Sequence, residues 1–198
     1  MTARVHVLVF DGFADWEPAY ALAELRRSGH HEVVAVGFGP QPVTSMGGLR
    51  VLPDRTPGDV RGEEVRLLIA PGGDLWERED AYPRAELEAL FARVLSAERP
   101  IAAICGATLA LARARLLDER RHTSNAPAYL SEAVPAYGGA AQYVPDLAVR
   151  DKGIITASGL GAVEFAREIF AELELFGAAD AALWFEMFRH GKLPEATT

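Results

Sequence analysis

The chain has 198 residues, a formal net charge of −8 and a hydrophobic content of 49%, which suits one compact domain over residues 1–198 with a full core. Its acidic balance, without a basic stripe, argues against nucleic acid or an anionic membrane as a partner. A single cysteine excludes an internal disulfide and fits a reducing cytoplasm, and no apolar run approaches membrane-spanning length.

Short apolar strands alternate with helical segments along the chain. The pattern predicts strands at 5–10, 32–36, 65–70, 101–104 and 154–157, and vaguer ones at 141–144 and 147–150. It predicts helices at 16–28, 85–97, 109–117, 126–132, 162–175 and 178–190, and a small hairpin around a glycine pair at 43–53. Several strands are apolar on both faces, so we expect a mainly parallel sheet covered by helices on both sides.

Ligands bind beyond the carboxyl ends of the strands in such sheets. The loops that follow Phe10, Ala70 and Ile104 lie at that edge, and each carries polar or glycine residues. We therefore expect these three loops to converge on one site.

Cys105 ends the strand at 101–104 and precedes a Gly-Ala-Thr step and strong helix formers. This pattern predicts a sharp strand–turn–helix junction with the cysteine at the helix N-terminus. Unpaired N–H groups and the helix dipole favour negative charge there, so we expect a lowered pKa of the thiol. The segment alone also allows a buried and inert core cysteine.

Two acidic residues precede the first predicted helix or lie in its first turn. If Glu17 reaches Cys105, its carboxyl can hydrogen-bond the thiolate or move a proton. It should then be buried and protonated, because two negative charges repel each other. The alternative for Glu17 is a residue that complements the helix dipole, whereas Asp15 has the position of an N-cap and is the rival acid.

Gly72 and Gly73 follow an apolar strand and a proline. Their backbone amides allow close approach and could stabilise an oxyanion, although a tight turn explains the pair equally well. Asn125, with Ser124 beside it, lies in a short extended piece after the cysteine helix. If Asn125 points at Cys105, it can donate a hydrogen bond but cannot act as a base.

Metal and nucleotide sites have no support in the sequence. No cluster of cysteine, histidine and aspartate has the spacing of metal ligands. The Gly-x-Gly fragments at 37–39 and 159–161 do not complete a dinucleotide fingerprint. We therefore expect no cofactor.

Four motifs in this order resemble those of the ThiJ/PfpI superfamily. They are the loop at 10–17, the glycine pair at 71–73, the cysteine turn at 103–107 and the closing strand and helix at 156–166. The resemblance covers nearly the whole chain. It implies a flavodoxin-like three-layer α/β/α sandwich, a homodimer, and a nucleophile elbow that holds a reactive Cys105 in a strained conformation. It also implies that Glu17 is the glutamate that bonds the cysteine.

Three positions depart from branches of that superfamily. Protease-type members have a histidine directly after the cysteine, where this chain has Gly106, and another branch has a histidine at the position of Asn125. Class I glutamine amidotransferases share the fold and need a late His-x-Glu pair, but Ala162 stands two residues before Glu164. The missing basic partners argue against peptidase and amidotransferase activity.

The resemblance favours a stress-related enzyme that acts on small reactive carbonyls, like glyoxalase or deglycase members. Cys105 would add to the carbonyl carbon, Glu17 would move the proton, and the amides of Gly73 and Gly106 would hold the oxyanion. One alternative is an oxidative-stress sensor or chaperone, in which Cys105 is oxidised without turnover. Another is isocyanide hydration, in which Asp15 would matter more than Glu17. The expected partners are a small-molecule substrate or oxidant and a second copy of the chain.

Overall fold

A six-stranded sheet with the order β2-β1-β5-β6-β8-β7 forms the centre of the computed structural model, which describes residues 3–193. The parallel strands are β1 (Ala3–Val9), β2 (His31–Gly37), β5 (Val65–Ala70), β6 (Ile101–Ile104) and β8 (Ile154–Ala157), whereas β7 (Ala148–Asp151) pairs antiparallel with β8. A separate antiparallel hairpin joins β3 (Val43–Thr44) and β4 (Arg50–Val51), as the glycine pair predicts.

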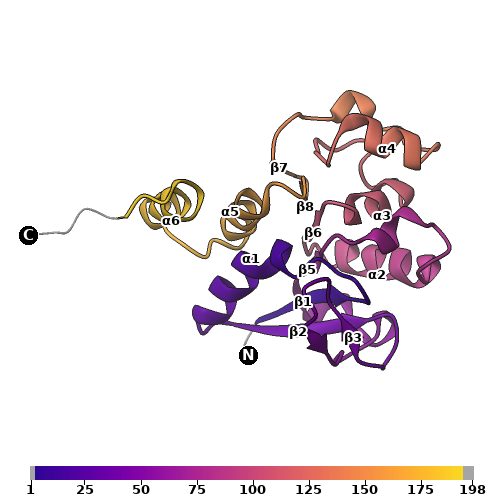
Figure 1. Cartoon of the computed structure of the whole chain (residues 1–198), viewed down its shortest axis with the longest axis horizontal. Helices are drawn as coiled ribbons and strands as arrows, with labels where there is room; N and C mark the ends of the chain where they lie inside the picture. The colour runs from indigo at the N-terminus through magenta and orange to yellow at the C-terminus, as the bar shows by residue number, and fades with distance from the viewer. Residues whose placement is uncertain (1–2, 194–198) are drawn as a thin grey trace, which may run out of the picture.

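Helices cover both faces of the sheet (Figure 1). α1 (Trp16–Arg27) and α5 (Ala162–Leu173) pack together on one face, and α2 (Arg84–Ser96) and α3 (Ala107–Arg113) lie on the other. α4 (Pro127–Ala133) packs beside α3, and α6 (Ala178–His190) packs on α5 outside the three layers. Short 3-10 helices form at Pro57–Asp59, Gly62–Glu64, Asp74–Glu77 and Ala140–Gln142.

Every residue of β6 and β8 is buried, because helices cover these central strands on both sides. The apolar runs that predicted them have no polar alternation for this reason. The architecture confirms the predicted three-layer α/β/α sandwich with a mainly parallel sheet. The carboxyl ends of β1, β5, β6 and β8 lie at one edge because these neighbours are parallel.

Trp184 anchors the final helix to the rest of the chain. Its side chain is buried, and its indole N–H donates to Glu24 Oε1 of α1 at 3.1 Å. Its ring packs edge-on against Phe170 and Tyr20. Trp184 therefore belongs to the core of this chain, whereas Phe188 on the same helix stays 43% exposed.

The helix after the cysteine is shorter than predicted. It ends at Arg113 and not near Leu117, because Arg115 adopts a left-handed conformation with φ 59°. The amides of Arg115 and Leu116 then bond the carbonyls of Ala112 and Leu111, which is the pattern of a Schellman motif.

The predicted strand at 141–144 is wrong. Residues Ala140–Gln142 form a 3-10 turn, and Tyr143 makes only an isolated bridge to His122. Apolar alternation over so short a piece did not distinguish a strand from a turn. The neighbouring prediction at 147–150 corresponds to β7.

Candidate active site

The loops after four parallel strands meet at Cys105. A Cβ atom added to Gly72, after β5, would lie 2.7 Å from Cys105 Cβ and 2.7 Å from Glu17 Oε2. One added to Gly159, after β8, would lie 3.0 Å from Cys105 Sγ. The three loops expected to converge therefore do so. The fourth, with Gly159, was missed as part of the site, although a glycine directly after a buried strand was a usable signal.

Cys105 occupies a strained turn between β6 and α3. Its φ is 57°, a left-handed conformation that costs a non-glycine residue of order 1–3 kcal/mol. Three hydrogen bonds hold it there: its amide donates to Ala157 O at 2.9 Å, and its carbonyl accepts from Thr108 Oγ1 at 2.6 Å and from the Thr108 amide at 3.2 Å. The half-buried thiol thus lies at the edge of the sheet, on the elbow that the resemblance implied.

Glu17 reaches the thiol from the first turn of α1. Its side chain is 1% exposed, and Oε2 accepts the Gly72 N–H at 2.6 Å. Burial raises the pKa of this carboxyl to about 7, against the opposing effects of hydrogen bonds from Gly72 and Cys105. Glu17 is therefore an acid that exchanges its proton near neutral pH, beside the thiol.

The expected lowering of the thiol pKa is wrong. Burial and, second, the charge of Glu17 raise the pKa of Cys105 to about 11. The helix-terminus effect is present, because a hydrogen bond from the Gly106 amide lowers this pKa. The hydrogen bond from Asn125 also lowers it, but burial and Glu17 outweigh both. The resting nucleophile is thus a thiol whose proton must be removed as it reacts.

The side chain of Asn125 bridges the thiol of Cys105 and the loop that follows β8. Its Nδ2 donates to Cys105 Sγ at 3.3 Å, and its Oδ1 accepts the Gly159 N–H at 3.0 Å. The second contact determines which end of the carboxamide faces sulfur. Asn125 therefore donates to the thiol and accepts no proton from it.

Ser124 lies behind the site and not in it. Its buried hydroxyl bonds the Thr108 hydroxyl at 2.7 Å, and its carbonyl accepts the Tyr143 hydroxyl at 3.1 Å. These contacts hold the segment that carries Asn125 against α3. Ser124 consequently positions Asn125, in place of the pocket role expected of it.

Asp15 faces the β3–β4 hairpin. Its Oδ2 accepts hydrogen bonds from the Ser45 hydroxyl and from the Gly47 amide. Asp15 does occupy the N-cap position of α1, as predicted, but its φ of −66° and ψ of −25° are already helical and its side chain makes no capping hydrogen bond. The carboxylate is used to hold the hairpin near the start of α1.

The backbone amides of the site glycines differ in whether they already donate a hydrogen bond. The Gly72 amide donates to Glu17, so its predicted oxyanion role is wrong. Gly73 has φ 147° and ψ 155°, a conformation that essentially only glycine adopts. Its amide makes no hydrogen bond within residues 3–193, and its carbonyl lies 3.0 Å from where a Cβ on Gly106 would be. Gly73 and Gly106 are thus adjacent beside the thiol.

Tyr129 of α4 is a site residue that the sequence did not reveal. Burial, the charge of Glu77 and the charge of Cys105 raise the pKa of its hydroxyl, which hydrogen-bonds Glu77. The phenol therefore stays neutral near Cys105, with its one proton directed to Glu77. Its spacing from Cys105 carries no motif, because the two residues meet only through the packing of α4 on α3.

The part of the chain that the structure describes contains no group of three His, Cys, Asp or Glu residues arranged to hold a metal ion. Within the same range, none of the helices combines the length and the apolar character needed to cross a membrane.

Comparisons with known proteins agree with this geometry. A Bacillus subtilis protein named as an uncharacterized protease, YoaZ, is 34% identical over 194 residues, which are 94% of this chain and 90% of that protein. A Pyrococcus abyssi deglycase is 32% identical over 121 residues, 61% of this chain and 71% of that protein. The crystal structure of a DJ-1 superfamily protein from Agrobacterium tumefaciens superposes with a TM-score of 0.87 at 36% identity, covering 97% of this chain and 100% of the other.

The match is not confined to single relatives. The model of the DJ-1/PfpI family covers residues 3–172, from the start of β1 to the end of α5. This range contains all four motifs that predicted the resemblance. The chain therefore belongs to the DJ-1/PfpI family.

Proposed function

We propose that this protein is an enzyme that acts on small reactive carbonyl compounds through Cys105, in the manner of a deglycase or glyoxalase. The observation that carries the proposal is the pairing of Cys105 with a buried carboxyl whose pKa is about 7. A general base works best when its pKa lies near the operating pH. Glu17 meets this condition and is hydrogen-bonded to the thiol.

The first chemical step is addition of the thiol to an aldehyde. Glu17 takes the Sγ proton as sulfur bonds the carbonyl carbon, and the electron pair of the C=O bond moves to oxygen. In this proposal the Gly73 amide, which makes no hydrogen bond within residues 3–193, holds that oxygen. Protonation by Glu17 then gives a hemithioacetal, with no net loss or gain of a proton.

A 2-oxoaldehyde can continue from this adduct with water as the only co-reactant. Glu17 takes the proton from the carbon bonded to sulfur, and the resulting enediol is reprotonated at the neighbouring carbon. The product is a thioester of Cys105, which water hydrolyses to a 2-hydroxy acid and free thiol. One proton carrier is enough for these steps, because each transfer returns the proton before the next.

The names of relatives support this class unevenly. The Pyrococcus abyssi relative is named a deglycase, whereas the Bacillus subtilis relative carries a protease label. Amide hydrolysis needs a group that protonates a leaving amine, usually the histidine beside the nucleophile. Gly106 and Asn125 occupy the two positions where family branches place a histidine, and neither side chain can supply that proton.

The alternatives have less support at this site. A redox sensor needs a substantial thiolate population, but burial and the charge of Glu17 raise the pKa of Cys105. Isocyanide hydration was expected to depend on Asp15, whose carboxylate bonds Ser45 and Gly47 on the hairpin. A redox sensor would oxidise Cys105 and an isocyanide hydratase would hydrate an isocyanide. In the following experiment, either one would leave the dicarbonyl unconsumed.

Methylglyoxal consumption and formation of lactate test the proposal. The wild-type rate should rise with pH through an apparent pKa of about 7 as Glu17 ionises. Cys105→Ser should abolish the reaction, and Glu17→Gln should reduce it by about 10²–10⁴-fold and remove the pH dependence.

Glu24→Gln is the matched control, because Glu24 is a second buried glutamate of α1 that contacts Trp184 and Arg27. It should leave the rate unchanged. Undiminished turnover in Cys105→Ser or in Glu17→Gln would overturn the proposed mechanism. Absence of dicarbonyl loss in the wild type would overturn the proposed substrate class.

A further inference from the structure

A second cavity lies at the opposite edge of the sheet, where the parallel strands begin. It has a volume of about 550 Å³. Seven of its nine lining residues are arginine or glutamate. The lining consists of Ala3, Arg4, Glu32, Arg61, Glu63, Glu64, Val65, Arg66 and Arg99. Charged side chains dominate this wall, so it suits a polar, charged ligand.

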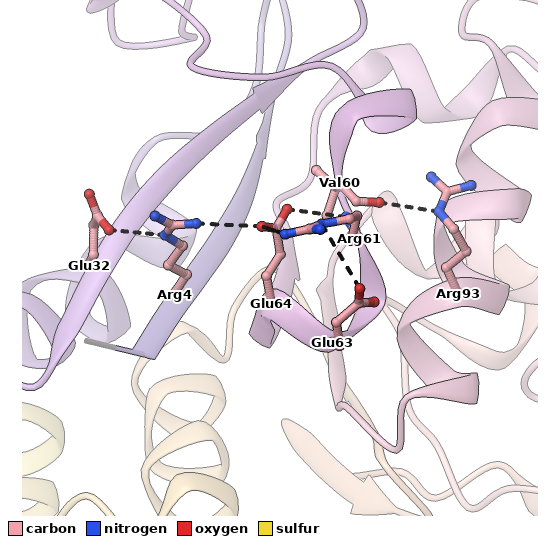
Figure 2. A network of polar contacts seen from close by, with 7 residues as sticks. All are labelled: Arg4, Glu32, Val60, Arg61, Glu63, Glu64 and Arg93. Atoms are coloured by element: carbon pink, nitrogen blue, oxygen red, sulfur yellow. Dashed lines mark hydrogen bonds and ion pairs between the residues drawn. The ribbon is translucent and has the colours of Figure 1, made fainter. Parts of the chain in front are cut away.

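The acidic side chains of this cavity are compensated by two of its arginines. Figure 2 shows a line of contacts that runs from Glu32 through Arg4, Glu64 and Arg61 to Glu63. Arg4 lies 3.2 Å from Glu32 and 3.5 Å from Glu64, and Arg61 lies 3.6 Å from Glu64 and 3.9 Å from Glu63. The negative charges on this wall are therefore already paired.

Arg66 and Arg99 are left over from this network. Neither forms an ion pair or a side-chain hydrogen bond within residues 3–193. Arg99 Nε is buried without a hydrogen-bond partner in that range, an arrangement that costs free energy unless a ligand or water supplies an acceptor. By contrast, the neighbouring Arg93 donates to the backbone carbonyl of Val60 (Figure 2). It also donates to the carbonyl of Pro57.

The backbone places Arg66 in the cavity by a local irregularity. Arg4 pairs with Val65 and Val5 pairs with Leu67, so Arg66 is an extra residue between two registered pairs. A bulge of this kind redirects a side chain and is rare between parallel strands. The chain thus departs from a regular sheet at the residue whose guanidinium is unpaired.

From this geometry we propose that the cavity binds a phosphate monoester of a small polyhydroxylated compound. The guanidinium groups of Arg66 and Arg99 bind the phosphate, since planar N–H donors match its oxygens. The glutamates accept hydrogen bonds from hydroxyl groups, for which a paired carboxylate keeps free lone pairs. The cavity exceeds what phosphate alone would fill, so the ligand carries a body beside its anionic group.

The site is separate from the cysteine chemistry. Arg66 lies at the beginning of β5 and Arg99 just before β6, whereas Cys105 follows the end of β6. A failure of carbonyl turnover therefore leaves this inference standing, and the reverse is also true. Binding at this edge can be measured without any assay of the thiol.

Isothermal titration calorimetry with glucose 6-phosphate tests the inference, with inorganic phosphate and glucose as the two fragments. We expect saturable binding with one site per chain, tighter than either fragment. Arg66→Gln and Arg99→Gln should each weaken it at least tenfold, and Arg66→Lys should weaken it less. Arg78→Gln is the control. Arg78 is exposed and follows the 3-10 helix beyond the carboxyl end of β5, at the opposite edge of the sheet, so this variant removes the same charge away from the cavity.

Cys105→Ser should bind glucose 6-phosphate as the wild type does. No saturable binding, or binding that is unchanged in both glutamine variants, would overturn the inference. Equal affinity for inorganic phosphate and glucose 6-phosphate would overturn the assignment of a polyhydroxylated body. An equal loss in Arg78→Gln would show that net charge, not this cavity, attracts the ligand.

Discussion

Replacing Glu17 by glutamine should stabilise the fold, and most strongly at alkaline pH. Burial raises the pKa of this carboxyl from 4.5 to about 7. The unfolded chain releases the proton near pH 4.5, whereas the folded protein keeps it until about pH 7, so wild-type stability falls as pH rises through this window. This rise in the pKa of Glu17 lowers the free energy of unfolding of the wild type by about 3 kcal/mol at pH 8 and by about 1 kcal/mol at pH 5.

Glutamine has nearly the same shape as glutamate and carries no charge. Its side-chain oxygen can still accept the hydrogen bond from the Gly72 amide. Urea denaturation of both proteins at pH 5 and pH 8 measures the two differences. Glu24→Gln, on the same helix, should show no comparable pH-dependent gain. If Glu17→Gln gives no gain in unfolding free energy, or an equal gain at the two pH values, the ionised carboxylate does not destabilise the fold. That result would contradict the role of Glu17 as a base near neutral pH.

Four further changes test individual parts of the site. Asn125→Ala should raise the pKa of Cys105 further, seen by thiolate absorbance, because it removes the Nδ2 donor to Sγ; a lower pKa would contradict this role. Gly159→Ala should slow carbonyl turnover at least tenfold with little change in melting temperature, since its Cβ would lie 3.0 Å from Sγ; unchanged turnover would mean that the thiol can yield. Cys105→Gly should be about 1 kcal/mol more stable to urea than Cys105→Ala, because glycine tolerates the φ of 57°, and equal stabilities would show that the turn is unstrained. The lowered pKa of the buried His6 means that the unfolded chain takes up the proton first as the pH falls, so His6 contributes stability above pH 6.5 that is lost below it. His6→Leu should therefore lose less stability below pH 6.5 than the wild type does. An unchanged pH dependence in that variant would contradict the assignment.

The local order of strands and helices could be read from the sequence because burial leaves a direct pattern. Central strands such as β6 are covered on both faces and are apolar at every position. The turn at Cys105 was equally visible, since a strand, a small-residue step and a helix follow one another within a few residues. Errors arose where the signal was short, as at Ala140–Gln142, or where a left-handed Arg115 ended α3 without a glycine.

The partners of Cys105 were only partly readable. Glu17 and Gly72 belong to motifs with a known order, whereas the sequence left open whether Asn125 points at the thiol. Gly159 and Tyr129 join the site through strand pairing and helix packing between segments distant in the chain. The contact of Tyr129 leaves no local pattern, whereas a glycine after a buried strand was the one local signal for Gly159.

The sequence by itself determined the elements, the fold class and the position of the one cysteine, because apolar periodicity and turn chemistry act between near neighbours. Only the tertiary structure decided the electrostatics of the site. How far Glu17 and Cys105 are buried, and that they lie side by side, depends on the order β1-β5-β6-β8. Desolvation and charge repulsion follow from that packing, which is why the pKa of the thiol rises where the helix terminus alone predicted a fall.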